Sequence, residues 1–574
     1  MKIFRNPLFW IFLLALVLRI YKLGEFPYGF HVDEVKVGWN ALSILKTGLT
    51  DQNNKLSLYY NSFGDYRPSG IFYFTIPAVA LLGRNEFATR IPVALVGALT
   101  IIPVYFLVEL IEKNKNRKSS KIKTGYIAGF LLAISPWHIE VSRATNEVVI
   151  STFFALFSIV FLIKLISTKK VRFGIFTIIS IATSYLFYHS IRFLGPLILI
   201  ATYYFYSNKN IDKKVRNWSI GCIAFSILLT LFFGINQKGL ARLSQTSIIK
   251  DVDLTYQIQR IQSENPNKNI LTMVFDNKPV IYFKTFATEY GKYFSEDFLV
   301  GSSGRPYRFA TPGVGLITYV ELLLLIFGVI QVIKDKKNLL PAILLILAPL
   351  PAAITAEDSP NLSRAFFMIP FLIYFEALGL EKILSFSYGF GSKFKKQITI
   401  GVLTLLFLNS SYFFYMYFNH SVSHRPYLKN YAGDSPTYRN VGTKELILKL
   451  DSLKTKYEKI VITNFPDNPY PWYAFFTNKD PLDINRTYNP DTKERVYGNI
   501  IFSQDKCPSD ESLVKYSKKN ILIVDSWECP YNSKIHDGYP LKIVGSIQRP
   551  DGTEVYALLE RDWAKPLLID GVYY

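Results

Sequence analysis

The chain has 574 residues, of which half are hydrophobic and 16% are aromatic, yet its formal net charge is +21. The basic residues fall in short gaps between hydrophobic runs and no zinc-finger or RNA-binding signature accompanies them, so the charge does not indicate a nucleic-acid-binding protein. Three cysteines in a chain of this length exclude a disulfide scaffold and a cysteine-based metal cluster.

Hydrophobic runs that approach the length of a membrane span recur along the first 418 residues. A span needs about 20 mostly apolar residues. About eleven runs qualify, at residues 7–23, 88–112, 125–138, 147–168, 171–188, 191–207, 218–234, 314–333, 338–355, 363–381 and 397–418. The first run ends in Tyr21, Lys22 and Leu23 rather than in small residues, so we expect an anchor and not a cleaved signal peptide. The pattern predicts a polytopic α-helical membrane protein.

The loops between these runs predict an orientation. With the N-terminus in the cytoplasm and alternating spans, the cytoplasmic loops are 113–123, 169–172, 209–216, 334–337 and 393–396, and all are basic, as the positive-inside rule requires. Residues 70–83 are too short to cross and are expected to lie in the interface. We therefore expect a multi-pass protein of the cell membrane, with outer loops at 24–87 and 235–313.

The tail, residues 419–574, changes character after the membrane domain of residues 1–418. Short β-rich strings at 459–463, 520–525 and 557–560 alternate with helix-like stretches such as 442–457, which predicts a soluble α/β domain on the extracytoplasmic side. Cys507 and Cys529 fall in its loops. In an oxidising compartment they could form a disulfide, and two free thiols are the alternative.

Two adjacent carboxylates, Asp33 and Glu34, follow the first span directly. Such a pair near the membrane face can divide the work of catalysis, one as general base and the other as a ligand or hydrogen-bond acceptor. The alternative is that Asp33 caps an interfacial helix, because Asp is a favoured N-cap residue.

Arginines stand at the expected outer ends of several spans, where positive charge is otherwise under-represented. Guanidinium groups bind phosphate in a bidentate manner, so a set of arginines facing a carboxylate pair favours a phosphate-bearing substrate. Anchoring to lipid headgroups, or pairing with nearby carboxylates, is the alternative for each one. The set comprises Arg67, Arg143, Arg192 and Arg364.

A divalent metal could join this outer face, although nothing in the spacing requires a cofactor. Glu34, Asp65 and His189 are the candidate ligands, and His189 lacks a second histidine one helical turn away. No phosphate-binding glycine loop and no Ser-His-Asp pattern is present, so soluble nucleotide use and serine hydrolysis lack support.

The first outer loop, FHVDEVKVGWNALSILKTG, resembles that of the GT-C class of membrane glycosyltransferases. The nearest family is glycosyltransferase family 39, which contains protein O-mannosyltransferases and aminoarabinose transferases. Members of this family have an Asp-Glu pair after the first span and then a motif of a basic residue followed by proline. In this chain the second motif is Arg67-Pro68. SPWHIEVSRATNEV and SPNLSRAFFMIP resemble later span-end motifs, and the resemblance covers residues 8–385 in order.

This resemblance implies roles for individual residues. Asp33 matches the catalytic base and Glu34 its neighbour. Arg67 matches a residue that contacts the lipid-carrier phosphate, although the family more often has Lys there, which keeps the charge and changes its geometry. Arg143 and Arg364 match arginines near the donor site, whereas Arg192 is added from topology alone.

The expected function is transfer of a sugar from a polyprenyl-phosphate donor to an acceptor hydroxyl of a protein, lipid or glycan, with inversion and with Asp33 as base. A transporter or flippase of lipid-linked glycans is one alternative, and it would place ionisable residues within the spans. A non-catalytic receptor would not need the Asp-Glu pair. An oligosaccharide ligase is a further alternative, because the same carboxylates and arginines would serve its reaction. The expected partners are the bilayer, the lipid-linked donor and an acceptor that the sequence does not identify.

Overall fold

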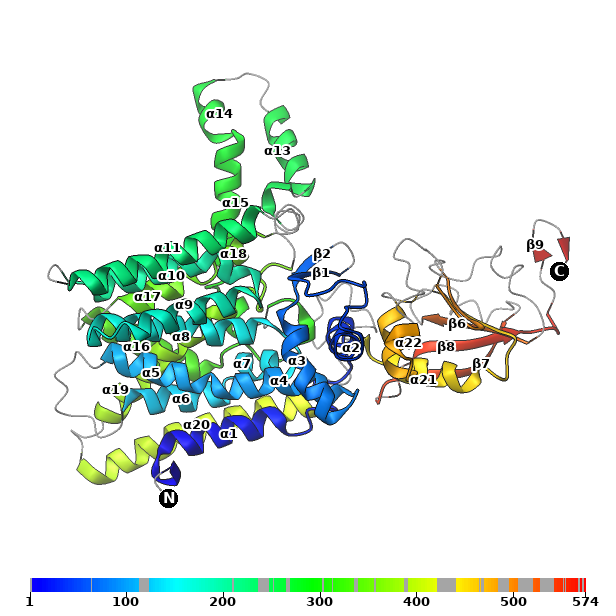
Figure 1. Ribbon diagram of the computed structural model, residues 1–574, viewed down its shortest axis with the longest axis horizontal. Helices are drawn as coiled ribbons and strands as arrows, with labels where there is room; N and C mark the ends of the chain where they lie inside the picture. Colours follow the sequence, from blue (N-terminus) through cyan, green and yellow to red (C-terminus); the bar gives the residue numbers. More distant parts are fainter. Residues whose placement is uncertain are drawn as a thin grey trace. The chain divides into compact units, whose positions relative to one another are not determined.

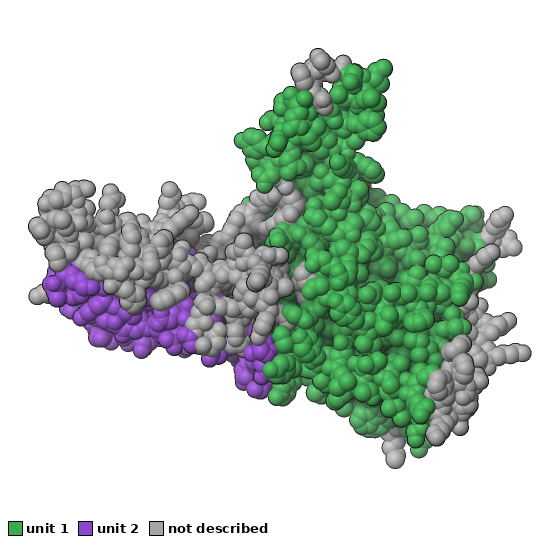
Figure 2. Space-filling view, turned by 180° about the vertical axis from the view of Figure 1, so that it is seen from behind, with its two compact units in different colours: residues 1–21, 57–71, 91–417 green, residues 22–56, 72–90, 418–574 purple. Residues whose placement is uncertain are grey.

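The computed structural model describes the chain except for residues 1–2, 63–64, 113–122, 209–210, 236–246, 251, 265–268, 302–303, 312, 335–338, 356–357, 387–390, 421–439, 464, 466–468, 484–494, 504–519, 527–540, 551, 553, 566–567, 570–571 and 574. The chain forms two compact units, which Figure 2 distinguishes by colour. The first unit comprises Met1–Tyr21, Ser57–Ile71 and Ile91–Tyr417, and the second comprises Lys22–Leu56, Phe72–Arg90 and Phe418–Tyr574. Residues 22–56 and 72–90, which are predicted to belong to the membrane domain of residues 1–418, therefore pack with the tail.

The first unit is a helical bundle with one small hairpin of strands (Figure 1). Its helices are α1 (Pro7–Ile20), α5 (Ile101–Glu112), α6 (Thr124–Ile134), α7 (Pro136–Arg143), α8 (Val148–Thr168), α9 (Arg172–Tyr185), α10 (His189–Tyr206), α11 (Lys213–Ile235), α13 (Val252–Glu264), α14 (Ile270–Phe275), α15 (Lys278–Lys292), α16 (Tyr319–Lys334), α17 (Leu340–Leu347), α18 (Leu350–Ala353), α19 (Ile369–Phe386) and α20 (Gly391–Asn419). Helix α4 (Glu86–Leu99) belongs to both units, and strands β1 (Tyr59–Ser62) and β2 (Asp65–Pro68) pair antiparallel.

Among the described residues, four helices are long and apolar enough to cross a membrane: Glu86–Glu112, Val148–Thr168, Lys213–Ile235 and Lys396–His420. Each coincides with a predicted span. Shorter apolar helices stand at Pro7–Ile20, Gly70–Leu82, Thr124–Ile134 and Leu340–Ala353. The protein is thus a helical membrane protein, and the number of its spans and their orientation stay predictions.

The run predicted at 125–138 is divided at Pro136. Ser135 is extended, with ψ of 120°, and α7 begins at the proline. The physical cause is local, because proline disfavours the helical conformation of the preceding residue and has no N–H to continue the helix. Because of this division, α7 is a separate helix, and Arg143 is its last residue.

Glycines allow α16 and α19 to cross closely. A Cβ atom on Gly328 would lie 1.8 Å from the Phe375 carbonyl oxygen, and one on Gly379 would lie 1.9 Å from that of Leu324. In lipid the hydrophobic effect does not drive helices together. Small residues such as these glycines let two backbones approach closely, and the resulting van der Waals packing stabilises the helix pair.

The second unit contains a six-stranded sheet in the order β4-β5-β3-β6-β8-β7. Strand β3 (Lys459–Ile462) pairs parallel with β5 (Ile500–Phe502) and β6 (Ile521–Ser526), whereas β4 (Arg495–Tyr497), β7 (Leu541–Gln548) and β8 (Glu554–Arg561) run antiparallel to their neighbours. Its helices are α2 (Val32–Thr47), most of α3 (Gly70–Leu82), α21 (Thr443–Leu453) and α22 (Pro469–Phe476), and β9 (Leu568–Ile569) and β10 (Val572–Tyr573) form a separate pair. The strands and the helix predicted for the tail are confirmed.

Candidate functional site

Helix α2 carries the Asp-Glu pair in its first turn. Its N-cap is His31, whose side chain accepts a hydrogen bond from the Asp33 N–H, while the Glu34 side chain accepts one from the His31 N–H at 3.2 Å. This reciprocal arrangement is a capping box, which satisfies two N–H groups that a helix start leaves without intrahelical partners. The alternative interpretation of Asp33, as the cap of this helix, is wrong, because the N-cap is His31.

Glu34 is buried and its carboxylate is engaged on both oxygens. Arg90 donates to Glu34 Oε1 from Nε at 2.9 Å and to Oε2 from Nη2 at 3.2 Å. The same guanidinium donates to the carbonyl oxygens of Leu23 at 3.1 Å and Gly29 at 2.6 Å. Arg90 therefore ties the loop before α2 to the start of α4, a role that was not predicted from the sequence.

Asp33 lies about 100° around the helix from Glu34 and keeps 19% of its side chain exposed. Its Oδ2 lies 3.4 Å from His31 Nδ1. Glu34 is held in a buried ion pair, whereas the Asp33 side chain keeps part of its surface exposed. The structure thus divides the pair into a sequestered glutamate and a partly accessible aspartate.

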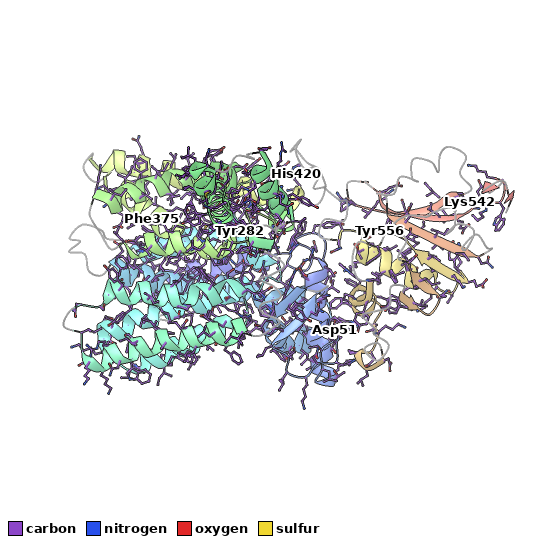
Figure 3. All side chains as sticks on the ribbon, turned by 90° about the horizontal axis from the view of Figure 1, so that it is seen from above. Asp51, Tyr282, Phe375, His420, Lys542 and Tyr556 are labelled. Atoms are coloured by element: carbon purple, nitrogen blue, oxygen red, sulfur yellow. The ribbon has the colours of Figure 1, made fainter. Side chains whose placement is uncertain are left out.

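A polar cluster continues along α2 beyond Asp33. Lys36 is buried one turn further on, and Asn40 accepts a hydrogen bond from the Asp51 N–H at 2.9 Å. Burial raises the pKa of Asp51, and the positive charge of Lys36 opposes that shift (Asp51 is labelled in Figure 3). Lys36 is thus a second buried cation near the pair, and it was not predicted.

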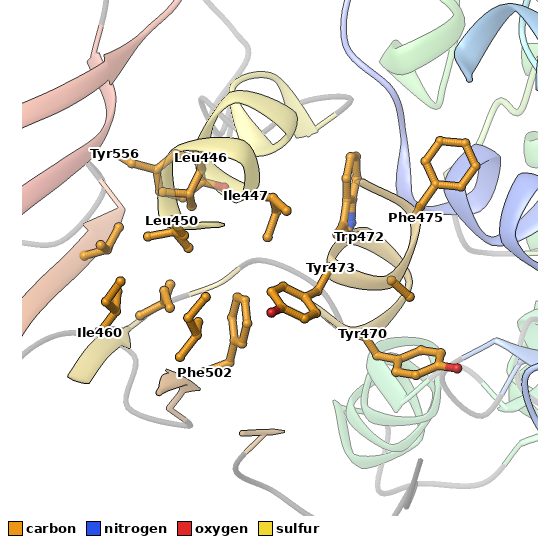
Figure 4. Packing of buried hydrophobic residues seen from close by; sticks show 14 of the residues in the cluster. Leu446, Ile447, Leu450, Ile460, Tyr470, Trp472, Tyr473, Phe475, Phe502 and Tyr556 are labelled. Atoms are coloured by element: carbon orange, nitrogen blue, oxygen red, sulfur yellow. The ribbon is translucent and has the colours of Figure 1, made fainter. Parts of the chain in front are cut away.

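The tail forms the hydrophobic core on which α2 rests. Phe30, Val32, Val35 and Trp39 share one buried cluster with residues of α21, α22 and the sheet, part of which is shown in Figure 4. The Trp39 indole donates to the Tyr470 hydroxyl at 3.3 Å. Within the second unit, the packing of the tail therefore holds the helix that presents Asp33.

Replacing Trp472 with alanine is expected to lower the free energy of unfolding of this unit by about 3–5 kcal/mol, because a fully buried aromatic side chain leaves a cavity. Trp472 is 0% exposed and packs against Phe30 and Phe476. Hydrogen exchange of the α2 backbone amides would report the loss. Trp563→Ala is the matched control, since Trp563 is 57% exposed and should leave the exchange unchanged.

Arg143 is completely buried, and its guanidinium binds the end of α1. It donates to the carbonyl oxygens of Leu18 at 2.9 Å and Tyr21 at 2.7 Å, and its Nε donates to the Tyr417 hydroxyl at 3.2 Å. A cation at a helix C-terminus satisfies carbonyl groups that lack partners and complements the helix dipole. These contacts favour the structural alternative for Arg143 over a phosphate ligand.

Arg192 is also buried and supports the β1–β2 hairpin. It donates to the Tyr185 carbonyl oxygen at 3.0 and 3.1 Å and to the Tyr59 hydroxyl at 2.6 Å. His189 Nε2 lies 3.1 Å from the Tyr66 carbonyl oxygen, and its Nδ1 lies 3.4 Å from Arg192. Both ring nitrogens thus face protein groups, which argues against His189 as a metal ligand.

Arg67 and Arg364 are only partly buried. Arg67 follows Tyr66 on β2, so Arg192 and His189 fix the strand that presents it. Arg364 donates to the Thr355 hydroxyl at 2.7 Å. Its charge lies near Tyr293, a residue whose burial raises its pKa to about 12.

Another arginine, which was not predicted, lies on a segment that pairs with the residues just before Arg364. The backbone of Arg305 pairs with that of Asn361, with hydrogen bonds to residues 360 and 362 at 2.9 and 2.7 Å. Its side chain is exposed. The segment before Arg364 thus brings an arginine from the 235–313 loop beside it.

Three of the predicted site residues have side chains that the structure does not describe. The side chain of Asp65 and both Cys507 and Cys529 belong to segments that the structure does not describe. Within the described residues, no group of three or more His, Cys, Asp or Glu side chains could hold a metal ion. Glu34, the third predicted metal candidate, has its carboxylate bound to Arg90.

A pocket of about 350 Å³ lies at the opposite end of α10 from Arg192. Its lining includes Lys169, Tyr206 and Asp212. Tyr206 is 14 residues beyond Arg192, or about 20 Å along the helix. This pocket is therefore separate from the candidate site.

Among solved structures, the chain is similar to the archaeal oligosaccharyltransferase AglB from Archaeoglobus fulgidus in complex with an inhibitory peptide and a dolichol-phosphate. The two chains are 14% identical, the similarity covers 96% of this chain and 74% of that one, and the TM-score is 0.50. The fold is that of a GT-C membrane glycosyltransferase. The resemblance read from the sequence is confirmed.

Further comparisons concern protein families, a second solved structure and curated sequences. The profile of the dolichyl-phosphate-mannose-protein mannosyltransferase family matches residues 67–233. ArnT from Cupriavidus metallidurans bound to undecaprenyl phosphate is similar at 12% identity, over 96% of this chain and 98% of that one, with a TM-score of 0.46. Comparison with curated protein sequences finds no match. The matched family and these structures are all of glycosyltransferases.

Proposed function

We propose that the protein transfers a sugar from a polyprenyl-phosphate donor to an acceptor hydroxyl at the outer face of the membrane. The observation that carries the proposal is the division of the Asp-Glu pair, in which Glu34 is bound to Arg90 and Asp33 stays partly exposed at the start of α2. The similar AglB structure is a complex with a dolichol-phosphate, and this ligand supports a lipid-phosphate donor.

In the proposed reaction, the Asp33 carboxylate takes the proton of the acceptor hydroxyl. The acceptor oxygen then forms a bond to the anomeric carbon of the sugar while the bond from that carbon to the phosphate oxygen breaks, and the configuration inverts. The electron pair of the broken bond stays on the lipid phosphate as negative charge. The N-terminal end of α2 stabilises negative charge on Asp33 and so favours the form that accepts a proton.

Arg67 and Arg364 are the proposed partners of the donor phosphate, because they are the partly exposed members of the predicted set. Guanidinium groups stabilise the leaving phosphate more strongly as its charge develops. Arg143 and Arg192 become positioning residues, since their donors are directed to protein carbonyl and hydroxyl groups. Glu34 becomes a positioning residue on the same reasoning.

Arg364→Gln is expected to lower kcat/KM for the lipid-linked donor by about 10²–10³-fold, the usual effect of removing one donor that stabilises developing charge. Arg364→Lys should restore part of the activity, since it keeps the charge and loses the bidentate geometry. Steady-state rates with purified protein in proteoliposomes would measure both.

The control for this series is Arg216→Gln, a change to an exposed arginine in the first turn of α11. It should transfer sugar at the wild-type rate. An Arg364→Gln variant with an unchanged kcat/KM would remove Arg364 from the donor site.

The test of the function itself is transfer of labelled hexose from polyprenyl phosphate in proteoliposomes. Acceptors of three kinds, a peptide with Ser and Thr, a hydroxylated lipid and an oligosaccharide, would be supplied in parallel. Product formed with any of them would support the proposal. Movement of the labelled lipid across the bilayer without transfer would contradict it and favour a flippase.

A further inference from the structure

Helices α13 to α15 form a hairpin that carries its own small core. Ile248, Leu254, Ile258 and Ile281 are buried together, and residues of both long helices pack around them. The hairpin is therefore held by contacts between α13 and α15. Its tip, helix α14, contributes no buried residue to this core.

Helix α14 is almost entirely apolar and almost entirely exposed. Ile270 is 78% exposed, Leu271 65%, Met273 67% and Phe275 63%. Phe283 on α15 is 70% exposed as well. A contiguous apolar patch of this kind marks a surface that another molecule or a membrane covers.

The direction of the hairpin indicates that a membrane, rather than another protein, covers this patch. In Figure 1, α13 and α15 run across the axes of α8 to α11, and Figure 3 looks along the hairpin from its tip. Helices α8 and α11 are candidate membrane spans, so their axes give the direction of the membrane normal. A hairpin that runs across these axes extends along the membrane plane rather than along the normal.

Exposed apolar side chains occur both at the end of α11 and at the base of the hairpin. At the end of α11, Leu228, Phe232 and Ile235 are 62%, 59% and 74% exposed. Beyond the undescribed segment, Ile249 and Val252 are 58% and 65% exposed. Exposed apolar side chains thus mark both the lipid-facing end of α11 and the base of the hairpin.

One edge of the hairpin is suited to water. Asp253, Arg260 and Glu264 recur at helical spacing on α13, and Arg260 Nε lies 2.9 Å from Glu264 Oε1 in a solvent-exposed pair. A charged edge beside apolar residues is the pattern of a helix that lies in a membrane interface.

We propose that the α13–α15 hairpin is an interfacial anchor whose apolar tip, Ile270–Phe275, inserts into the bilayer beside the bundle, at the membrane face where α11 ends. The ligand is the acyl region of membrane lipid. This anchor is independent of sugar transfer, and it widens the contact of the protein with one leaflet.

The test uses the full-length protein in nanodiscs that hold a single copy, made of phosphatidylcholine with a diazirine in its acyl chain. After irradiation, lipid adducts should map to residues 269–283, as they should to the lipid-facing peptide 228–235. A Phe275→Asp variant should lose adducts at the tip, while hydrogen exchange at Leu254 and Ile281 stays unchanged because the hairpin core is intact.

Methionine oxidation by a water-soluble oxidant gives a second measurement. Met273 should oxidise at least about tenfold more slowly in nanodiscs than a methionine placed on the charged edge by Gln257→Met, because lipid excludes water from the tip. Rapid oxidation of Met273 without lipid adducts would overturn the proposal. Slow oxidation without adducts would also overturn it, in favour of a protein partner.

Discussion

Asp33→Asn is expected to lower kcat for transfer from a polyprenyl-phosphate hexose by roughly 10²–10⁴-fold, the range for removal of a general base. The amide keeps the shape of the carboxylate and cannot take the acceptor proton. Folding should be unchanged, because the cap of α2 depends on His31 and Glu34 rather than on the Asp33 side chain. Initial rates in proteoliposomes, with kcat and KM determined separately, would measure the effect.

The matched control for this variant is Asp480→Asn. Asp480 is 44% exposed on the surface of the same unit and pairs with Lys46 at 3.4 Å, so its removal should leave transfer unchanged. Donor binding by the Asp33→Asn variant should stay at the wild-type level. Transfer by Asp33→Asn at the wild-type rate would show that another group is the base.

Glu34→Gln is expected to act on stability, with a loss of about 3–5 kcal/mol in the free energy of unfolding of the second unit. The substitution leaves the Arg90 guanidinium buried without its counter-charge, and the side chains of Arg90 and Glu34 are 1% and 4% exposed. Denaturant unfolding in detergent, followed by hydrogen exchange of α2 and the first turn of α4, would measure it.

A double-mutant cycle separates the ion pair from other contacts of each partner. Glu34→Leu and Arg90→Met should each destabilise the unit, and the double variant should lose less than the sum by about 0.5–3 kcal/mol. Arg90 also holds the carbonyl groups of Leu23 and Gly29, so its single variant should be the more severe. If Glu34→Gln abolished transfer with no loss of stability, Glu34 would be a catalytic residue and not a positioning one.

Asp33 and Glu34 are neighbours with the same charge, yet the first substitution is expected to affect catalysis and the second to affect stability. The difference comes from rotation along α2, which directs Glu34 toward Arg90 and leaves Asp33 partly exposed. It also gives the tail a role that the sequence left open, because the cluster around Trp472 and Tyr470 packs against Val35 and Trp39 of the same helix. Damage to the core of the tail is therefore expected to reach the site through α2.

Much of the architecture follows from the sequence. The runs at 88–112, 147–168, 218–234 and 397–418 each became a long apolar helix, and the strings at 459–463 and 520–525 became neighbouring strands. Span length and strand alternation are local properties, since they depend on the bilayer thickness and on the two-residue period of a strand. The order of short motifs along the chain was also sufficient to recognise the GT-C class.

The roles of individual charged residues were decided only by tertiary structure. Arg143 and Arg364 look alike at the ends of apolar runs, yet Arg143 binds the end of α1, 122 residues away at Tyr21, while Arg364 stays partly exposed. Glu34 obtained its partner 56 residues away. A charge can be buried only where a partner compensates its lost hydration, and that partner comes from whichever distant segment the fold brings near. Local sequence therefore located the charged residues, and the packing of the chain determined which of them remain available to a substrate.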